Sequence, residues 1–189
     1  MRAYHFLRDD MTAASGDEPA WTVGETRTLP ADRKIIPCEY GYHASPTLFD
    51  ALVYAPGSMA CVVEIDGDVT PHGDPLDKYA ARTRTLVAAV DLTVALRLYA
   101  ADCAEHVLPL FEAERPNDDR PRKAIEAARA YARGEIGAAA REAAVWAAAA
   151  TSASAREAAG WAAAAAERAW QRQHFDATAL PLLEEEARS

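Results

Sequence analysis

Residues 37–73 decide the fold of this chain; they read P-C-E-Y-G-Y-H-A-S-P-T-L-F-D-A-L-V-Y-A-P-G-S-M-A-C-V-V-E-I-D-G-D-V-T-P-H-G. Ser45 followed by Pro46 is a typical helix start, because serine caps the first amides and proline needs no amide partner there. The sequence therefore predicts a short helix over 47–54. The run 59–66, rich in valine and isoleucine, predicts the clearest strand.

The segments on either side of this stretch also favour short strands. The polar residues between them contain many turn formers, as expected of loops that connect strands. We place His43 in a loop just before the short helix. Further strands are expected at 4–7, 21–29, 34–36, near Val69 and at 83–90.

The hydrophobic period changes to that of a helix after Asp91 and stays helical. Helices are expected at 92–111, 122–133, 135–150, 154–175 and 180–187. In the first of them the apolar face comprises Leu92, Leu96, Tyr99, Cys103, Val107 and Leu110. His106 is expected in the core beside Cys103.

The helical part is rich in alanine and repeats the unit A-R-E-A-A from Ala140 and again from Ala155. Alanine favours helices and adds little bulk, so such helices can approach closely. The tryptophans Trp146, Trp161 and Trp170 then supply most of the apolar area, although ligand stacking is an alternative role for them. The predicted class is α+β, with a small β-rich module at 1–90 and an alanine-rich helical bundle at 91–189.

The charge of the chain argues against direct binding to nucleic acid. The formal net charge is −9 among 189 residues, with acidic residues in excess both before and after residue 91. Phosphate backbones are repelled by such a chain. Ordinary solubility charge and an acidic mimic of nucleic acid are both compatible with this composition.

Other sequence features predict a cytoplasmic protein without a cofactor. We find no run of about 18 strongly apolar residues and no signal peptide at the start of the sequence. The three cysteines, Cys38, Cys61 and Cys103, form no C-x-x-C pair and are expected to be reduced thiols. Neither a metal site nor membrane association is predicted.

Several separated blocks of the first half occur in the order of a known family. They are Y-H-F at 4–6, C-E-Y-G-Y-H-A-S at 38–45, D-A-L-V-Y-A-P-G at 50–57, C-V-V-E-I-D-G-D-V at 61–69 and P-H-G-D-P-L-D-K-Y-A-A-R-T-R-T-L at 71–86. This half resembles DUF7666-like domains, an uncharacterised bacterial and phage-associated family. The chain has Tyr40-Gly41-Tyr42 where that family usually has a glycine-leucine form.

The second half resembles immunity-type helical domains of polymorphic toxin systems. The resemblance rests on V-L-P-L-F-E at 107–112 and D-D-R-P-R-K-A-I-E-A-A-R-A-Y-A-R-G-E-I at 118–136. It implies a protein partner, such as a toxin or a component of a defence system, in phage–host or toxin–inhibitor conflict. We therefore expect a non-enzymatic inhibitor that occludes its partner, and a homodimer is an open alternative. Neither family provides catalytic residues to transfer.

The residue most suited to chemistry is His43, because amides at the start of the following helix could face an anion beside it. The order of turn, helix and strand is similar to ADP-ribosyltransferase-like scaffolds. That similarity implies a nucleotide or NAD site formed by His5, His43, Ser45 and Tyr54, with Glu64 as the acid. Tyr42 is a further candidate binding residue. The alternative is that His43 only orders its loop.

Four arginines precede or lie on one predicted helix: Arg120, Arg122, Arg129 and Arg133. Acidic residues alternate with them, which is typical of a solvated face with ion pairs. The immunity-type resemblance favours a second interpretation, a recognition surface for a protein partner.

Overall fold

The computed structural model describes residues 1–14, 18–137 and 161–188. The chain forms two compact units: Met1–Thr93 together with Asp176–Ser189, and Val94–Phe175. The first unit contains the strands, and the regular elements in the described residues of the second unit are helices. The predicted α+β class is confirmed.

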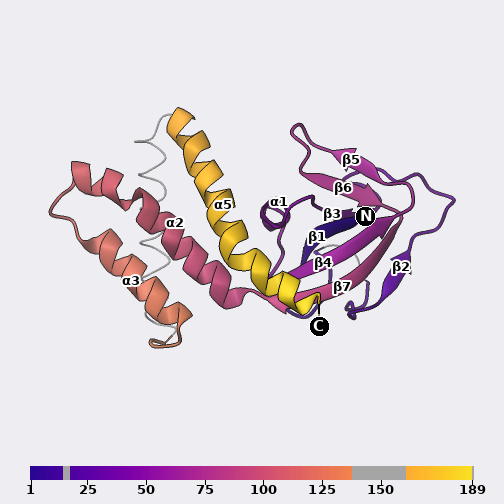
Figure 1. Ribbon diagram of the computed structural model, residues 1–189, viewed down its shortest axis with the longest axis horizontal. Helices are drawn as coiled ribbons and strands as arrows, with labels where there is room; N and C mark the ends of the chain where they lie inside the picture. Colours follow the sequence, from indigo (N-terminus) through magenta and orange to yellow (C-terminus); the bar gives the residue numbers. More distant parts are fainter. Residues whose placement is uncertain (15–17, 138–160, 189) are drawn as a thin grey trace. The chain divides into compact units, whose positions relative to one another are not determined.

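The larger sheet of the first unit has four antiparallel strands in the order β1-β4-β7-β2 (Figure 1). The strands are β1 (Arg2–Leu7), β4 (Met59–Asp66), β7 (Thr83–Asp91) and β2 (Thr26–Thr28). The central strand β4 is buried on both faces, since all four residues of 60–63 are inaccessible to solvent. This explains why its sequence is a continuous apolar run with no polar alternation.

A second, three-stranded antiparallel sheet has the order β3-β6-β5. Its strands are β3 (Tyr42–Ala44), β6 (Lys78–Ala81) and β5 (Thr70–His72). One hydrophobic core joins the two sheets and includes Cys61, Val63 and Leu86 from the first and Tyr42 and Ala81 from the second. The two sheets therefore share one core, and the isolated bridge between Tyr4 and Ser45 links the residue after β3 to β1.

The short helix α1 (Leu48–Leu52) begins one residue later and ends two residues earlier than predicted. Its N-cap is Thr47, whose Oγ1 accepts the Asp50 amide at 3.1 Å. The predicted N-cap, Ser45, exchanges backbone hydrogen bonds of 2.7 and 2.9 Å with Tyr4. Because that bridge keeps Ser45 extended, the helix begins only after Pro46.

The strand predictions were right for the long strands and wrong for several short ones. Strand β4 matches the predicted 59–66, and β7 extends the predicted 83–90 by one residue. Of the predicted segment 21–29 only Thr26–Thr28 is a strand, and 34–36 contributes a single bridge between Ile36 and Tyr40. His43 lies in β3 and not in a loop.

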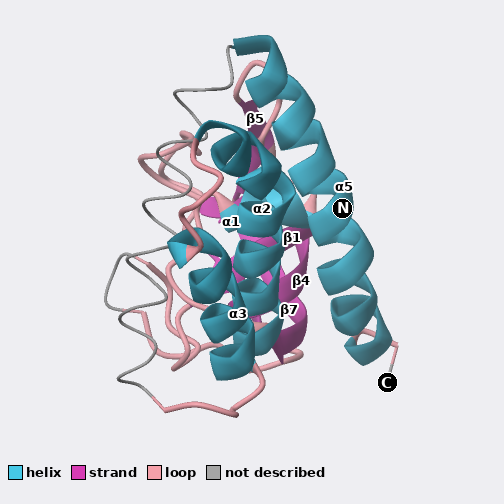
Figure 2. Cartoon of the chain, turned by 90° about the vertical axis from the view of Figure 1, so that its left-hand side faces the viewer, coloured by secondary structure: helices cyan, strands magenta, loops and turns pink. Residues whose placement is uncertain are grey.

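The second unit contains the antiparallel pair α2 (Thr93–Glu114) and α3 (Arg120–Ala132), which Figure 2 shows side by side. Their core consists of Ala101, Ala104 and Leu108 from α2 with Ile125 from α3. The predicted apolar face of α2 was therefore partly wrong, since small alanines make the contact and Leu110 is exposed. Alanines at the contact allow the two helix axes to approach closely.

Helix α5 (Trp161–Glu186) continues through the predicted break between 175 and 180, with Pro181 inside it. Its residues up to Phe175 belong to the second unit and the later ones to the first, where Ala179 and Leu183 are buried. The predicted helix 135–150, Trp146 and the start of the helix predicted at 154 lie outside the described residues. Within the described parts, no helix has the length and apolar character needed to cross a membrane.

Candidate functional site

The first unit contains a cavity of about 470 Å³, here called the Arg84 pocket. It is lined by residues from β1, β3, β6, β7 and α1 and from the loops before β2 and β3. The glycine before β3, Gly41, is also part of the wall. The pocket thus lies where the edges of both sheets and the short helix α1 meet.

Most residues predicted for a small-ligand site line this pocket. Tyr42, His43, Ser45 and Tyr54 are in its wall, and His5 joins them from β1. Glu64 does not, because it is exposed while its neighbours Val63 and Ile65 point into the core. The geometry therefore brings the predicted binding residues together without the predicted acid, and their role in binding remains a proposal.

The imidazole of His43 is held in one tautomer by the loop before β3. Its Nε2 accepts the backbone N–H of Cys38 at 2.9 Å, so a neutral ring carries its proton on Nδ1. Burial, followed by the positive charges of Lys78 and Arg84, lowers the pKa of His43. The ring is consequently neutral at physiological pH and can donate from Nδ1.

Arg84 is the pocket residue that the sequence analysis missed. It lies on the inward face of β7 and is only 3% exposed. One guanidinium N–H donates to the His43 carbonyl at 3.1 Å, and the guanidinium carbon lies 4.3 Å from the Trp21 ring centroid and 5.1 Å from that of Tyr42. Within the described residues no carboxylate forms an ion pair with it. Burial lowers the pKa of Arg84 to about 10, and the group stays a cation at neutral pH.

His5 lies beside Arg84 on the pocket wall. Its Nε2 is buried and has no hydrogen-bond partner among the described residues. Burial, the charge of Arg84 and His43 together hold the pKa of His5 well below its usual value. Buried polar atoms are nearly always hydrogen-bonded, so an unpartnered ring nitrogen in a pocket wall needs an explanation.

Other polar groups of the pocket are already engaged with each other. The Tyr42 hydroxyl donates to Glu18 at 3.0 Å, and burial together with this carboxylate raises the pKa of Tyr42 to about 12. Tyr54 donates to Asp77 at 2.5 Å, and Lys78 Nζ lies 4.3 Å from the Tyr54 ring centroid. These contacts hold the side chains of Tyr54 and Lys78 in place in the pocket wall.

Metal chemistry finds no support in the described residues. Among them no group of three or more His, Cys, Asp or Glu side chains is placed to hold a metal ion. The thiol of Cys38 lies 3.8 Å from His72 Nε2, and Cys61 is buried in the core. Two side chains are fewer than the three or four protein ligands of a typical zinc site.

The four predicted arginines of the helical unit all form ion pairs. Arg122 donates to both oxygens of Glu112 at 2.7 and 2.9 Å, which joins α3 to α2. Arg129 bridges Asp102 at 2.6 Å and Glu105 at 2.7 Å in the same way. Arg120 pairs with Asp118 and Arg133 with Glu135. The structure therefore shows a surface of ion pairs, and its use in recognition remains a proposal.

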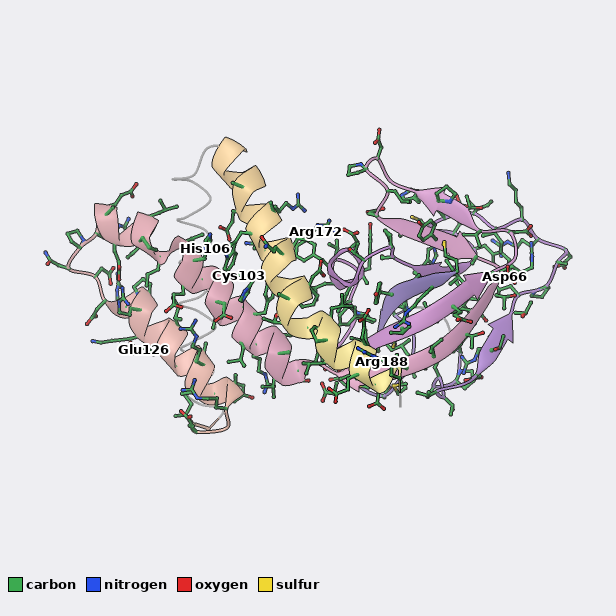
Figure 3. The ribbon with its side chains drawn as sticks, in the orientation of Figure 1. Asp66, Cys103, His106, Glu126, Arg172 and Arg188 are labelled. Atoms are coloured by element: carbon green, nitrogen blue, oxygen red, sulfur yellow. The ribbon has the colours of Figure 1, made fainter. Side chains whose placement is uncertain are left out.

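A stack of rings lies between α2 and the first part of α5. His106 and Trp170 are parallel at a centroid distance of 3.8 Å, and His174 stacks on Trp170 at 4.8 Å. Figure 3 labels His106 on α2, one turn after Cys103. The side chain of His106 is 40% exposed, so its predicted place in the core was wrong. Its Nε2 lies 3.3 Å from Glu167 Oε2.

The comparisons with known proteins match each half to a different family. Residues 93–180 match the model described as "Imm-5 like putative immunity protein", and residues 1–98 match the "Domain of unknown function (DUF7666)". No curated protein matches, and no solved structure matches. The DUF7666 match, over residues 1–98, covers just over half of the chain and contains the whole Arg84 pocket. The chain belongs to the DUF7666 family.

Proposed function

We propose that this protein is an immunity-type inhibitor whose helical part binds a protein partner and occludes it. The match of residues 93–180 to the immunity-protein model carries the proposal. A toxin or a defence-system component is the class of partner that such a role requires. The binding surface would be the exposed side of the α2–α3 pair.

The charged groups of α3 support this choice of surface. The side chains of Arg120, Arg122 and Arg133 are 80%, 52% and 51% exposed, so each can reach a partner. Each is also held by a carboxylate, which reduces the rotamer freedom that binding would remove. Arginines fixed in this way are well suited to pair with a partner's carboxylates.

Arg129 has a different role in this proposal. Its side chain is 26% exposed and its donors are used by Asp102 and Glu105. We therefore assign it to holding α3 against α2. Replacement of Arg129 would disturb the surface, whereas replacement of Arg120, whose partner Asp118 is not on α2, would only remove a contact from it.

A lysine-specific cross-linker can test which part of the chain meets the partner. Lys123 is the single lysine of residues 93–180, and Lys34 and Lys78 are the others in the chain. The full-length chain is immobilised, exposed to host proteins and cross-linked, and the linked peptides are identified by mass spectrometry. We expect links from Lys123, and links only from Lys34 or Lys78 would contradict the proposal.

The same partner allows a quantitative test of occlusion. Adding the chain at equal molar amounts should abolish the partner's activity. Arg120→Glu should weaken binding by about 10-fold or more, as expected when a charge in the interface is reversed. Arg188→Glu, an exposed arginine near the C-terminus, should leave binding unchanged. Equal losses in both variants, or full activity of the saturated partner, would rule out this surface.

A further inference from the structure

We infer that the Arg84 pocket binds a small organic oxyanion, a carboxylate or a phosphate ester, with the Arg84 guanidinium as its principal contact and His5 and His43 beside it. This goes beyond the proposed function, because the pocket lies wholly in the first unit and partner binding is assigned to the helical part. The two sites can therefore be tested separately.

The first argument is the cost of burying Arg84. A buried cation is normally paired with a carboxylate, because its lost hydration is expensive. Arg84 is 3% exposed, and its one protein hydrogen bond among the described residues goes to a carbonyl. A guanidinium has five N–H donors in a planar fork, so most of them remain available. An oxyanion in the pocket would accept two of them side by side.

The carboxylate whose charge acts on Arg84, that of Glu18, is already occupied by other groups. Glu18 lines the pocket and its charge acts on Arg84, yet it accepts the Tyr42 hydroxyl at 3.0 Å. Its second oxygen is 3.4 Å from Arg27. Glu18 is therefore paired with Arg27 and Tyr42, and the Arg84 guanidinium remains free to pair with a ligand.

The second argument comes from the two histidines. His5 Nε2 is buried without a partner, and His43 can donate from Nδ1 because its Nε2 accepts the Cys38 amide. Both rings line the same pocket as Arg84. One oxyanion could thus accept from the guanidinium and from these two rings. This arrangement accounts for the unpartnered nitrogen and the unpaired cation together.

The size and lining of the pocket select an organic ligand. A volume of about 470 Å³ lies in the range of small-molecule sites, roughly 300–1,000 Å³. Ala13, Leu29 and Ala51 add apolar wall to the polar groups. A bare inorganic anion would leave this wall uncovered, so the ligand should carry an apolar or aromatic body. Lys78 lines the pocket as well and would favour entry of an anion.

A ligand-binding role and a purely structural role of Arg84 predict opposite effects of its removal on stability. If the guanidinium served only to stack on Trp21 and Tyr42, its removal would cost stability. If it is kept for a ligand, Arg84→Met should unfold at a temperature equal to or higher than that of the wild type. Methionine preserves most of the aliphatic volume and removes the buried charge.

The test uses the full chain, charged probes and their neutral analogues. Adenosine monophosphate is compared with adenosine, and benzoate with benzyl alcohol, by isothermal titration calorimetry. We expect one anion of the two to bind and its neutral analogue to bind at least about 10-fold more weakly. Binding of the phosphate ester or of the carboxylate identifies which oxyanion the site prefers. Equal binding of anion and analogue, or no binding of either anion at about 10 mM, would overturn the inference.

Three variants and one measurement on the wild type complete the test. Arg84→Met should lose at least about 10-fold in affinity, whereas Arg82→Met, which removes an arginine paired with Asp68 outside the pocket, should keep it. Arg84→Lys keeps the charge without the fork and should lose part of the affinity. If Arg84→Met does not fold, the test is the side-chain NMR spectrum of the wild type. Signals of His5 and His43 should shift when the anion is added. Unchanged signals at saturating anion would overturn the inference.

Discussion

His5 and His43 make the stability of the first unit depend on pH. Both have a folded pKa below the usual 6.5, His5 strongly so, chiefly because they are buried. The unfolded chain therefore binds more protons than the folded chain below about pH 6.5. We expect the free energy of unfolding to be highest above that pH and to fall as the pH drops toward the folded pKa values. Urea unfolding at pH about 7.5 and about 5.5 measures the difference.

Replacement of one ring separates this effect from that of other groups. His5→Gln should reduce the change in unfolding free energy between the two pH values. Asp118 has a pKa lowered to about 2 by its hydrogen bond from Arg120, and its folded form titrates below the tested range. An unchanged pH dependence in His5→Gln would show that His5 is not buried as a neutral ring.

Gly41 positions β3 at the wall of the Arg84 pocket. Its φ of 151° and the space around it exclude a side chain, since a Cβ would lie 3.0 Å from Ala80 Cβ and 3.1 Å from Ile35 Cγ2. Gly41→Ala should lower the free energy of unfolding by about 2 kcal/mol. Gly137→Ala is the matched control, because nothing lies within 4 Å of a Cβ there. Equal unfolding midpoints of the two variants in urea would contradict the assigned constraint.

At the scale of the elements, the cap of α1 can be assigned by two substitutions. Thr47 accepts the Asp50 amide and donates to the Asp50 carboxylate at 2.6 Å. Thr47→Ala should therefore cost about 1 kcal/mol in thermal or urea unfolding. Ser45 is held to Tyr4 by backbone bonds that Ser45→Ala preserves, so that variant should cost less. A larger loss of unfolding free energy in Ser45→Ala than in Thr47→Ala would show that Ser45 is the cap.

Asp102 connects the helices of the second unit. Its carboxylate accepts Arg129 at 2.6 Å and lies 2.8 Å from His174 Nε2. Because these side chains are about a quarter exposed, the coupling of Arg129 with Asp102 should be only about 0.5–1 kcal/mol. A double-mutant cycle with Arg129→Met and Asp102→Asn measures it. Strict additivity of the two losses would show that this ion pair does not hold α3 to α2.

The long elements could be predicted from the sequence and the short ones could not. Strand β4 carries a run of β-branched residues, which decides its type locally. Strands β3 and β6 have three and four residues, and pairing with each other stabilises them more than their own propensity does. A break was predicted between 175 and 180, yet α5 continues through it. Tertiary contacts thus overrode local signals in both cases.

The candidate site was predictable where its residues lie close together in sequence. Tyr42, His43 and Ser45 surround one short segment, and the pocket contains all three. Arg84 was missed although a signal existed, because period-two alternation along β7 places it on the same face as Leu86 and Ala88. The same rule would have excluded Glu64 from the candidate site, because Glu64 alternates with the inward-facing Val63 and Ile65.

At the scale of the whole molecule, the net charge of −9 should govern nonspecific binding. We expect the chain to be retained by an anion exchanger at neutral pH and to pass through a heparin column without retention. Its affinity for duplex DNA should be undetectable by gel shift at low salt. Retention on heparin that salt removes would contradict the expectation that the chain does not bind nucleic acid directly.

The two units carry two separate proposals, partner binding by the helical part and oxyanion binding in the Arg84 pocket. Partner binding is the central one, because it rests on the match of residues 93–180 to the immunity-protein family model. Hydrogen–deuterium exchange of the full chain, alone and with the captured partner, tests it at the level of peptides. We expect slower exchange in peptides of α2 and α3 and unchanged exchange in peptides of β3 and β6. Protection confined to β3 and β6, with α2 and α3 unaffected, would contradict partner binding by the helical part.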